Sequence, residues 1–145
     1  MQNRNKLRTS KGSKPLITVG IILFLLQEEQ LRLITADLLE NAIIATKSCE
    51  SRRILFAIGV LDGGYEVRVE DSGVDFEEET LRDLGKKRTT THKDEGGSGI
   101  GMMEVFDVMR ETAASLEIKR LTKSGRGFSK RISFIFDGLG EYRVI

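Results

Sequence analysis

The stretch RRILFAIGVLDGGYEVRVEDSG, residues 52–73, carries the pattern that decides the fold. Apolar side chains occupy every second position on both sides of a short turn: Ile54, Phe56 and Ile58 before it, and Tyr65, Val67 and Val69 after it. A period of two is typical of strands with one buried face. The turn itself, Asp62-Gly63-Gly64, has the Asp-Gly composition of tight hairpins. This stretch therefore predicts an antiparallel hairpin whose second strand ends near Asp71.

Helical periodicity flanks this hairpin. Before it, apolar residues three or four positions apart predict a long helix over about residues 28–47: Leu31, Ile34, Leu38, Ala42 and Ala45. After it, a short helix is expected over about residues 77–85, with Gly85 as its stop. A second long helix is expected after Gly101, with one apolar face: Met102, Phe106, Met109 and Ala113.

The rest of the chain completes the predicted fold. Residues 86–99 contain no large apolar side chain and predict a long loop, and strands are expected at 115–121 and 129–138. The order is therefore helix, hairpin, short helix, loop, helix and two strands. This order predicts an α/β (α+β) two-layer sandwich, in which helices cover one face of a mixed, largely antiparallel sheet.

The composition excludes several function classes. Lys and Arg number 23 and Asp and Glu number 22, so the chain has no positive surplus for binding nucleic acid. Cys49 is the only cysteine, which excludes an internal disulfide and fits a reducing cytoplasm. One cysteine and one histidine also argue against a zinc site. The apolar run at 15–26 is shorter than the ~20 residues of a membrane span, so direct membrane contact is not expected.

The length of 145 residues suits a single domain. Residues 1–14 are polar and basic and are expected to form a flexible tail. The predicted domain therefore covers residues 15–145, with the run 15–26 as a buried strand or the start of a core helix.

Two residues of the first helix suggest a metal site. Asp37 and Asn41 stand four positions apart, so their side chains emerge on one face, one turn from each other. Oxygen atoms in this arrangement could hold a hydrated magnesium ion. The alternative is that both residues line a solvated helix face.

Asp71 lies where the second hairpin strand ends and Gly73 bends the chain. An ionised carboxylate only accepts hydrogen bonds, so it could recognise the exocyclic amine of adenine. The alternative is that Asp71 does no more than cap the next turn.

The segment DEGGSGIGMMEVFDVM, residues 94–109, places four glycines directly before a helix: Gly96, Gly97, Gly99 and Gly101. A helix N-terminus offers unpaired N–H groups and the positive end of the helix dipole, which together suit a phosphate. The alternative is a mobile surface loop before a core-packing helix.

Three segments in this order carry a resemblance. DLLENAIIA (37–45) resembles the N box, VEDSGVDF (69–76) the first glycine box and GGSGIGMMEVF (96–106) the second glycine box of the GHKL ATPases, the superfamily of gyrase, Hsp90, MutL and the sensor histidine kinases. The chain looks most like the ATP-binding catalytic domain of a bacterial two-component sensor histidine kinase, over about residues 31–137. The resemblance implies the Bergerat ATP-binding fold, with a lid at about 77–99 that closes over the triphosphate.

The resemblance also implies roles for particular positions. Asn41 would bind Mg²⁺, and Asp37 would stand where hydrolysing relatives have a glutamate base. Asp71 would accept the adenine amine, and Gly73 would let the base approach the backbone closely. The residues implied to face the triphosphate are Lys86, Lys87 and Arg88 in the lid and Gly97, Gly99 and Gly101 at its end.

Three further positions qualify this assignment. Ser133 would help Asp71 hold an ordered water at the base, although Ser129 is also available. Asp75 stands where the first glycine box has its second glycine, and a side chain there could crowd the nucleotide. The only histidine, His92, lies in the lid, so the phosphoaccepting histidine is implied to lie on a separate segment.

The implied function is transfer of the γ-phosphate of ATP, with Mg²⁺, to a histidine on the dimerisation domain of a parent receptor. A response regulator would be the downstream partner. The chain would be a cytoplasmic catalytic domain of a membrane-bound receptor, inactive in autophosphorylation by itself. Two alternatives remain open: an anti-sigma-factor-type serine kinase or other GHKL ATPase, and a degenerate nucleotide-sensing interaction module without transfer activity.

Overall fold

The computed structural model of the chain describes residues 27–61, 64–87, 103–121 and 126–145. In these ranges the helices are α2 (Glu28–Thr46), α3 (Glu78–Lys87) and α4 (Met103–Thr112). The strands are β1 (Ile54–Leu61), β2 (Gly64–Asp71), β3 (Ser115–Arg120), β4 (Lys130–Phe136) and β5 (Tyr142–Val144).

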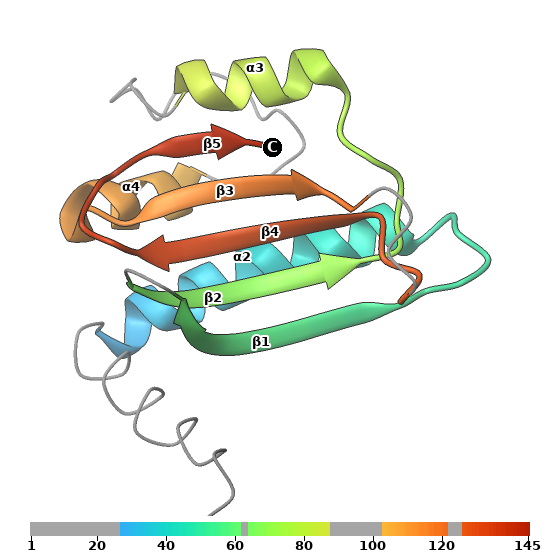
Figure 1. Cartoon of the computed structure of the whole chain (residues 1–145), viewed down its shortest axis with the longest axis horizontal. Helices are drawn as coiled ribbons and strands as arrows, with labels where there is room; N and C mark the ends of the chain where they lie inside the picture. Colours follow the sequence, from blue (N-terminus) through green and yellow to red (C-terminus); the bar gives the residue numbers. More distant parts are fainter. Residues whose placement is uncertain (1–26, 62–63, 88–102, 122–125) are drawn as a thin grey trace, which may run out of the picture.

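These strands form one sheet with the order β1-β2-β4-β3-β5 (Figure 1). β1 and β2 pair as the predicted antiparallel hairpin, with Phe56 opposite Val69 and Ile58 opposite Val67. β4 is antiparallel to both β2 and β3, whereas β5 runs parallel to β3. The expectation of a mixed, largely antiparallel sheet is therefore confirmed.

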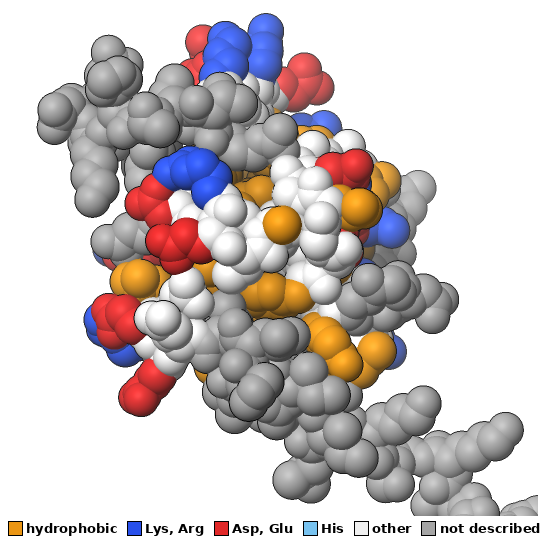
Figure 2. All heavy atoms as spheres, turned by 90° about the vertical axis from the view of Figure 1, so that its left-hand side faces the viewer, with side chains coloured by type: hydrophobic (Ala, Val, Ile, Leu, Met, Phe, Trp, Pro, Cys, Tyr) orange, Lys and Arg blue, Asp and Glu red, His pale blue; other side chains and the backbone are white. Residues whose placement is uncertain are grey.

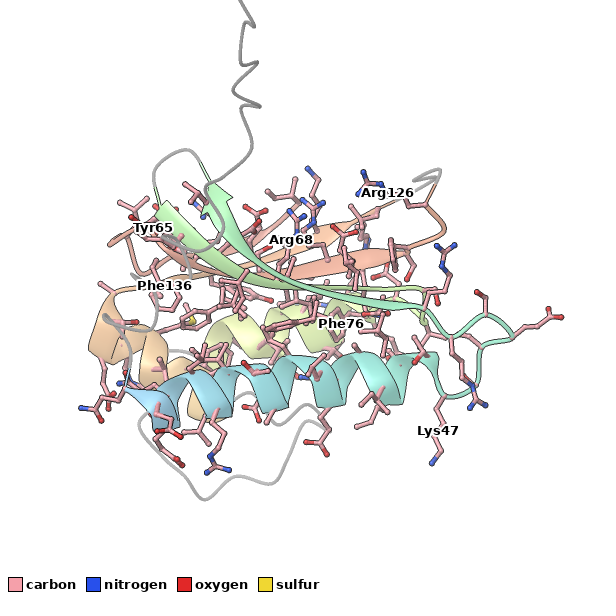
Figure 3. The ribbon with its side chains drawn as sticks, turned by 90° about the horizontal axis from the view of Figure 1, so that it is seen from below. Lys47, Tyr65, Arg68, Phe76, Arg126 and Phe136 are labelled. Carbon is pink, nitrogen blue, oxygen red and sulfur yellow. The ribbon has the colours of Figure 1, made fainter. Side chains whose placement is uncertain are left out.

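The described helices form the second layer, on one face of the sheet (Figures 1 and 3). α2 packs against β2 and against α4. α3 lies near the sheet edge formed by β5, where the Tyr142 hydroxyl donates a hydrogen bond to the carbonyl oxygen of Leu81 (2.8 Å). The two-layer sandwich predicted from the element order is confirmed.

The hydrophobic core fills the space between the two layers, because alternate strand residues point toward the helices. The buried sheet residues are Val67, Val69, Leu116, Ile118, Ile132 and Phe134, and the buried helix residues include Ile34, Leu38, Ala42, Leu84, Phe106 and Met109. Phe76 and Phe136 pack against this core from the layer between sheet and helices (Figure 3). Each fully buried Val, Leu, Ile, Phe or Met side chain contributes about 1.5–3 kcal/mol to folding.

The opposite face of the sheet carries ion pairs. Arg68 of β2 lies on this face, away from α2 (Figure 3), and its guanidinium contacts Glu66 at 2.9 Å. Arg131 of β4 contacts Glu70 at 2.6 Å. Both carboxylates are almost fully buried among their neighbours, so pairing with arginine offsets the cost of removing their charge from water.

One end of the molecule, where α4 lies, mixes apolar and charged surface. Hydrophobic side chains are exposed there in small groups, between charged side chains and backbone (Figure 2). Small exposed groups of this kind are normal on the surface of folded domains. No helix within the described ranges is long and apolar enough to cross a membrane.

Two element bounds differ from the sequence-based expectation. Gly85 does not end α3, which continues to Lys87. A Cβ atom at Gly85 would lie 3.0 Å from Tyr142 Cε1, so this glycine allows close packing of the helix against the tyrosine ring. The first two residues of the predicted loop at 86–99 therefore belong to α3. The same helix occupies residues 78–87 of the lid predicted at about 77–99. The sequence did not predict a strand at the position of β5. The predicted tail 1–14 and the apolar run 15–26 lie outside the described residues.

Candidate functional site

Asp71 ends β2 with a fully buried side chain. Its Oδ1 atom accepts two hydrogen bonds, from the Gly73 backbone N–H at 2.8 Å and from Lys130 Nζ at 2.7 Å. Its Oδ2 atom is also buried, and no described residue donates a hydrogen bond to it. An unpaired buried carboxylate oxygen is costly, so this atom suits a ligand that brings a donor.

Lys130 is the cation that accompanies this carboxylate. It begins β4 and faces Asp71 in the sheet register, on the side of the sheet that the helices cover. Its Nζ atom also donates to the carbonyl oxygen of Val74 and lies 5.4 Å from the centre of the Phe76 ring. Lys130 thus ties the end of β2 to the following loop.

The first glycine box packs closely against the C-terminal part of α2. A Cβ atom on Gly73 would lie 2.5 Å from the backbone carbon and oxygen of Ala45, a distance that real contacts do not show. The N–H of Val74 donates to the same Ala45 carbonyl oxygen at 3.2 Å. Glycine is therefore required at position 73 for packing against the helix, whether or not a base also approaches it.

The two candidate serines lie on different sides of the site. Ser129 Oγ donates to the carbonyl oxygens of Gly73 (2.6 Å) and Asp71 (3.1 Å), so it supports the glycine box directly. Ser133 of β4 is buried and pairs with Arg68 of β2 in the sheet register. Arg68 and Asp71 are three positions apart on β2, so their side chains lie on opposite faces of the sheet. Ser133 therefore lies on the face away from the Asp71 side chain. The expectation that Ser133 assists Asp71 does not fit this geometry.

Asp75, which replaces a glycine of the first glycine box, is directed toward β3. Its Oδ2 atom lies 2.8 Å from Arg120 Nε, and its Oδ1 atom accepts from the Phe76 N–H at 2.8 Å. The Asp75 side chain is exposed and engaged by these contacts. The expectation that this side chain could crowd a bound nucleotide stays a prediction.

Asn41 and Asp37 lie on α2, and the structure joins them by a hydrogen bond. Asn41 Nδ2 donates to the backbone carbonyl oxygen of Asp37 at 2.9 Å. Asn41 is 9% exposed and Asp37 is half-buried, so the alternative of a solvated helix face does not hold for Asn41. One turn further along α2, Ala45 packs against Gly73. The metal candidate Asn41 and the loop that follows the base candidate Asp71 therefore lie at the same, C-terminal part of α2.

The candidate triphosphate residues are only partly within the described ranges. Lys86 lies in the last turn of α3, exposed, 3.7 Å from Asp83. Lys87 is the final residue of that helix. The remaining candidates, Arg88, Gly97, Gly99 and Gly101, lie outside the described residues, as does His92. Among the described residues there is no group of three or more acidic, histidine or cysteine side chains that could hold a metal ion.

A comparison with protein families decides the family. Residues 26–138 match the family described as histidine kinase-, DNA gyrase B-, and HSP90-like ATPases. The chain belongs to this family. Asp71, Asn41 and the whole described sheet except β5 fall within the matched range, so the family's ATP-binding domain accounts for the fold. A search of curated proteins finds no match.

Sequence reasoning missed one residue of this ATP-binding domain. Lys130 was not considered, although its position carries a usable signal. Ile132 and Phe134 follow it at a period of two and point into the core, so Lys130 falls on the core face. A lysine on a core face requires a buried anionic partner.

Proposed function

We propose that the chain is the ATP-binding catalytic domain of a sensor histidine kinase, which transfers the γ-phosphoryl group of ATP to a histidine on a separate dimerisation domain. Membership of the ATPase family supports nucleotide binding. The observation that carries the proposal is the unpaired, buried Oδ2 atom of Asp71, beside a glycine box held in place by hydrogen bonds.

Asp71 is the residue proposed to recognise the adenine base. Its Oδ2 atom can accept a hydrogen bond from the exocyclic amine of adenine, whereas the keto oxygen of guanine would meet a second acceptor. The loop after Asp71 is already held by Ser129, Lys130 and the contact with Ala45. A preorganised loop loses little conformational entropy on binding.

Asn41 is the proposed magnesium ligand. Its amide nitrogen is occupied by the Asp37 carbonyl oxygen, which leaves the amide oxygen as the atom available to a hard cation. When bound, Mg²⁺ offsets the negative charge of the phosphates. Lys86, Lys87 and Arg88 would add positive charge near the triphosphate, and Gly97, Gly99 and Gly101 would present backbone N–H groups to it, as the resemblance implies.

Transfer is favoured over hydrolysis by the residue at position 37. Aspartate is one methylene shorter than the glutamate base of hydrolysing relatives and would reach an attacking water less well. Phosphoryl transfer needs mainly positioning and charge stabilisation from the protein. The nucleophile would come from the histidine-bearing partner, and a response regulator would receive the phosphoryl group afterwards.

The proposed arrangement is a cytoplasmic domain at residues 15–145 of a longer receptor, preceded by a flexible tail at 1–14. In such an arrangement the chain binds ATP by itself but acquires activity only with its dimerisation domain.

The test joins the chain to a histidine-bearing dimerisation segment and supplies ATP labelled at the γ-phosphate. The expected result is an acid-labile, base-stable label on that histidine. An acid-stable label on serine would support the serine-kinase alternative instead. Release of free phosphate without protein labelling would indicate a hydrolysing ATPase, and failure to bind ATP would indicate an interaction module.

A further inference from the structure

Lys130 has no role in the three sequence boxes, yet it is the most deeply buried cation of the described chain. Its side chain is 1% exposed and pairs with Asp71, which is 0% exposed. Burying two charges costs free energy that their attraction offsets only with good geometry and further hydrogen bonds. A buried pair at a ligand site therefore calls for an explanation beyond stability.

The ammonium group of Lys130 has three N–H donors, and two of them are engaged by described residues. One donor goes to Asp71 Oδ1 at 2.7 Å and another to the Val74 carbonyl oxygen. The Phe76 ring, 5.4 Å away, lies at a distance suited to a cation–π contact. These contacts direct Lys130 toward protein groups, and its side chain is 1% exposed.

This arrangement makes the two oxygens of Asp71 unequal. Oδ1 is held by two donors from different segments, the Gly73 N–H and Lys130 Nζ. Oδ2 has no donor among the described residues. Two bonds at one oxygen restrict rotation of the carboxylate, so Oδ2 stays in place as an acceptor.

We propose that Lys130 is a positioning residue for base selection: it fixes the orientation of the Asp71 carboxylate so that the unpaired Oδ2 atom selects a purine that carries an amine at its 6-position. This inference rests on the proposed reading of adenine by Asp71. It adds a residue to that site and assigns it to discrimination between bases rather than to binding of the phosphates.

Replacing Lys130 by methionine preserves the unbranched chain and removes the ammonium group. Oδ1 then keeps only the Gly73 donor, and the carboxylate can rotate. Once the carboxylate rotates, Oδ2 is no longer held in place as an acceptor, so the preference for an amine falls. The Val74 carbonyl oxygen also loses its link to β4.

The test compares two nucleotides that differ by one group: Mg–ATP and the Mg complex of purine riboside 5′-triphosphate, which lacks the 6-amino group. Affinities are measured by calorimetric titration of the full chain. The wild-type protein should prefer ATP by about tenfold to about a hundredfold, the range expected for one hydrogen bond to a charged group. In Lys130→Met the preference should fall to about threefold or less, through weaker binding of ATP.

Arg131→Met is the matched control. Arg131 is the next residue of β4 and pairs with Glu70, another carboxylate that is almost fully buried, but on the opposite face of the sheet. This control should lose stability and keep the wild-type preference for ATP. A purely structural role of Lys130 would make the two variants behave alike.

The outcomes separate the two claims. If the wild-type protein fails to distinguish the two nucleotides, reading of adenine by Asp71 fails and this inference fails with it. If the wild type distinguishes them and Lys130→Met does so equally well, only the role of Lys130 is overturned. Should Lys130→Met not fold, Lys130→Gln replaces it, because the amide keeps a donor without the charge. An intermediate preference is then expected, and an unchanged preference overturns the inference.

Discussion

Lys130 Nζ lies 2.7 Å from Asp71 Oδ1, and this buried ion pair joins the end of β2 to the start of β4. The pair sits beneath the glycine box, so it couples the stability of the sheet to the geometry of the candidate base site. Loss of either member leaves a buried charge without compensation, which is more costly than loss of both.

The first prediction concerns the stability of this pair. Lys130→Met should lower the free energy of unfolding by about 3–5 kcal/mol, and addition of Asp71→Asn should restore part of that loss because neither charge remains. Urea denaturation of the single and double variants measures both effects. Lys86→Met is the control: its partner Asp83 is 3.7 Å away at the surface, so the change should stay below about 1 kcal/mol. Additive losses in the double variant would contradict a coupled pair.

The second prediction concerns the base. Asp71→Asn should weaken ATP binding by about 1.5–3 kcal/mol, because the amide loses the charge and can present an N–H group to the adenine amine. Discrimination against GTP should fall as well. Titration calorimetry measures both, with Asp137→Asn as the control. Asp137 accepts from Ser115 Oγ at 2.8 Å and lies beyond the far end of β4, so this variant should keep normal affinity. Unchanged ATP affinity in Asp71→Asn would refute the assignment.

The third prediction concerns the metal. Asn41→Ala should remove most of the magnesium dependence of triphosphate binding. It should cost only about 0.5–1.5 kcal/mol of stability, because it breaks one hydrogen bond, to the Asp37 carbonyl oxygen. ATP affinity with and without Mg²⁺ is the measurement, and Glu40→Ala, at the exposed neighbouring position, is the control. A variant that melts at a lower temperature yet keeps the wild-type response to magnesium would make Asn41 a structural residue.

The fourth prediction concerns the close contact between the glycine box and α2. Gly73→Ala should destabilise the fold by about 1–3 kcal/mol or more, because the new methyl group would lie 2.5 Å from the backbone of Ala45. Gly59→Ala is the matched control: a methyl group there would have no described atom within 4 Å beyond its chain neighbours, so the change should stay within about 0.5 kcal/mol. Thermal denaturation of the two variants compares them directly. Equal stability would show that the loop moves away from the helix at little cost.

Most of the fold could be predicted from periodicity. The period of two at Ile54, Phe56 and Ile58 indicated the hairpin, and the helical spacing of apolar residues indicated α2 to within one residue at its end. The failures have local causes. β5 has three residues, too few to show a period, and it forms by pairing with the distant strand β3. Gly85 has the composition of a helix stop, but its contact with Tyr142 depends on tertiary packing.

Candidate site residues could be predicted only where the neighbouring sequence indicates their position on a helix or at a strand end. Asp71 at a strand end and Asn41 on a helix face could be recognised from spacing. The choice between Ser133 and Ser129 could not be made from the sequence, because it depends on the register of β2 with β4. The pairing of Lys130 with Asp71 depends on the same register, which joins residues far apart in the chain.

Calorimetric titration of the full chain with Mg²⁺ and a non-hydrolysable ATP analogue tests the central claim most directly, with the matching GTP analogue as the competitor. The account predicts that the ATP analogue binds to a single site, that its full affinity needs Mg²⁺, and that it is preferred over the GTP analogue by about tenfold or more. Absence of binding, or equal affinity for the two analogues, would contradict the reading of Asp71 as the residue that recognises adenine.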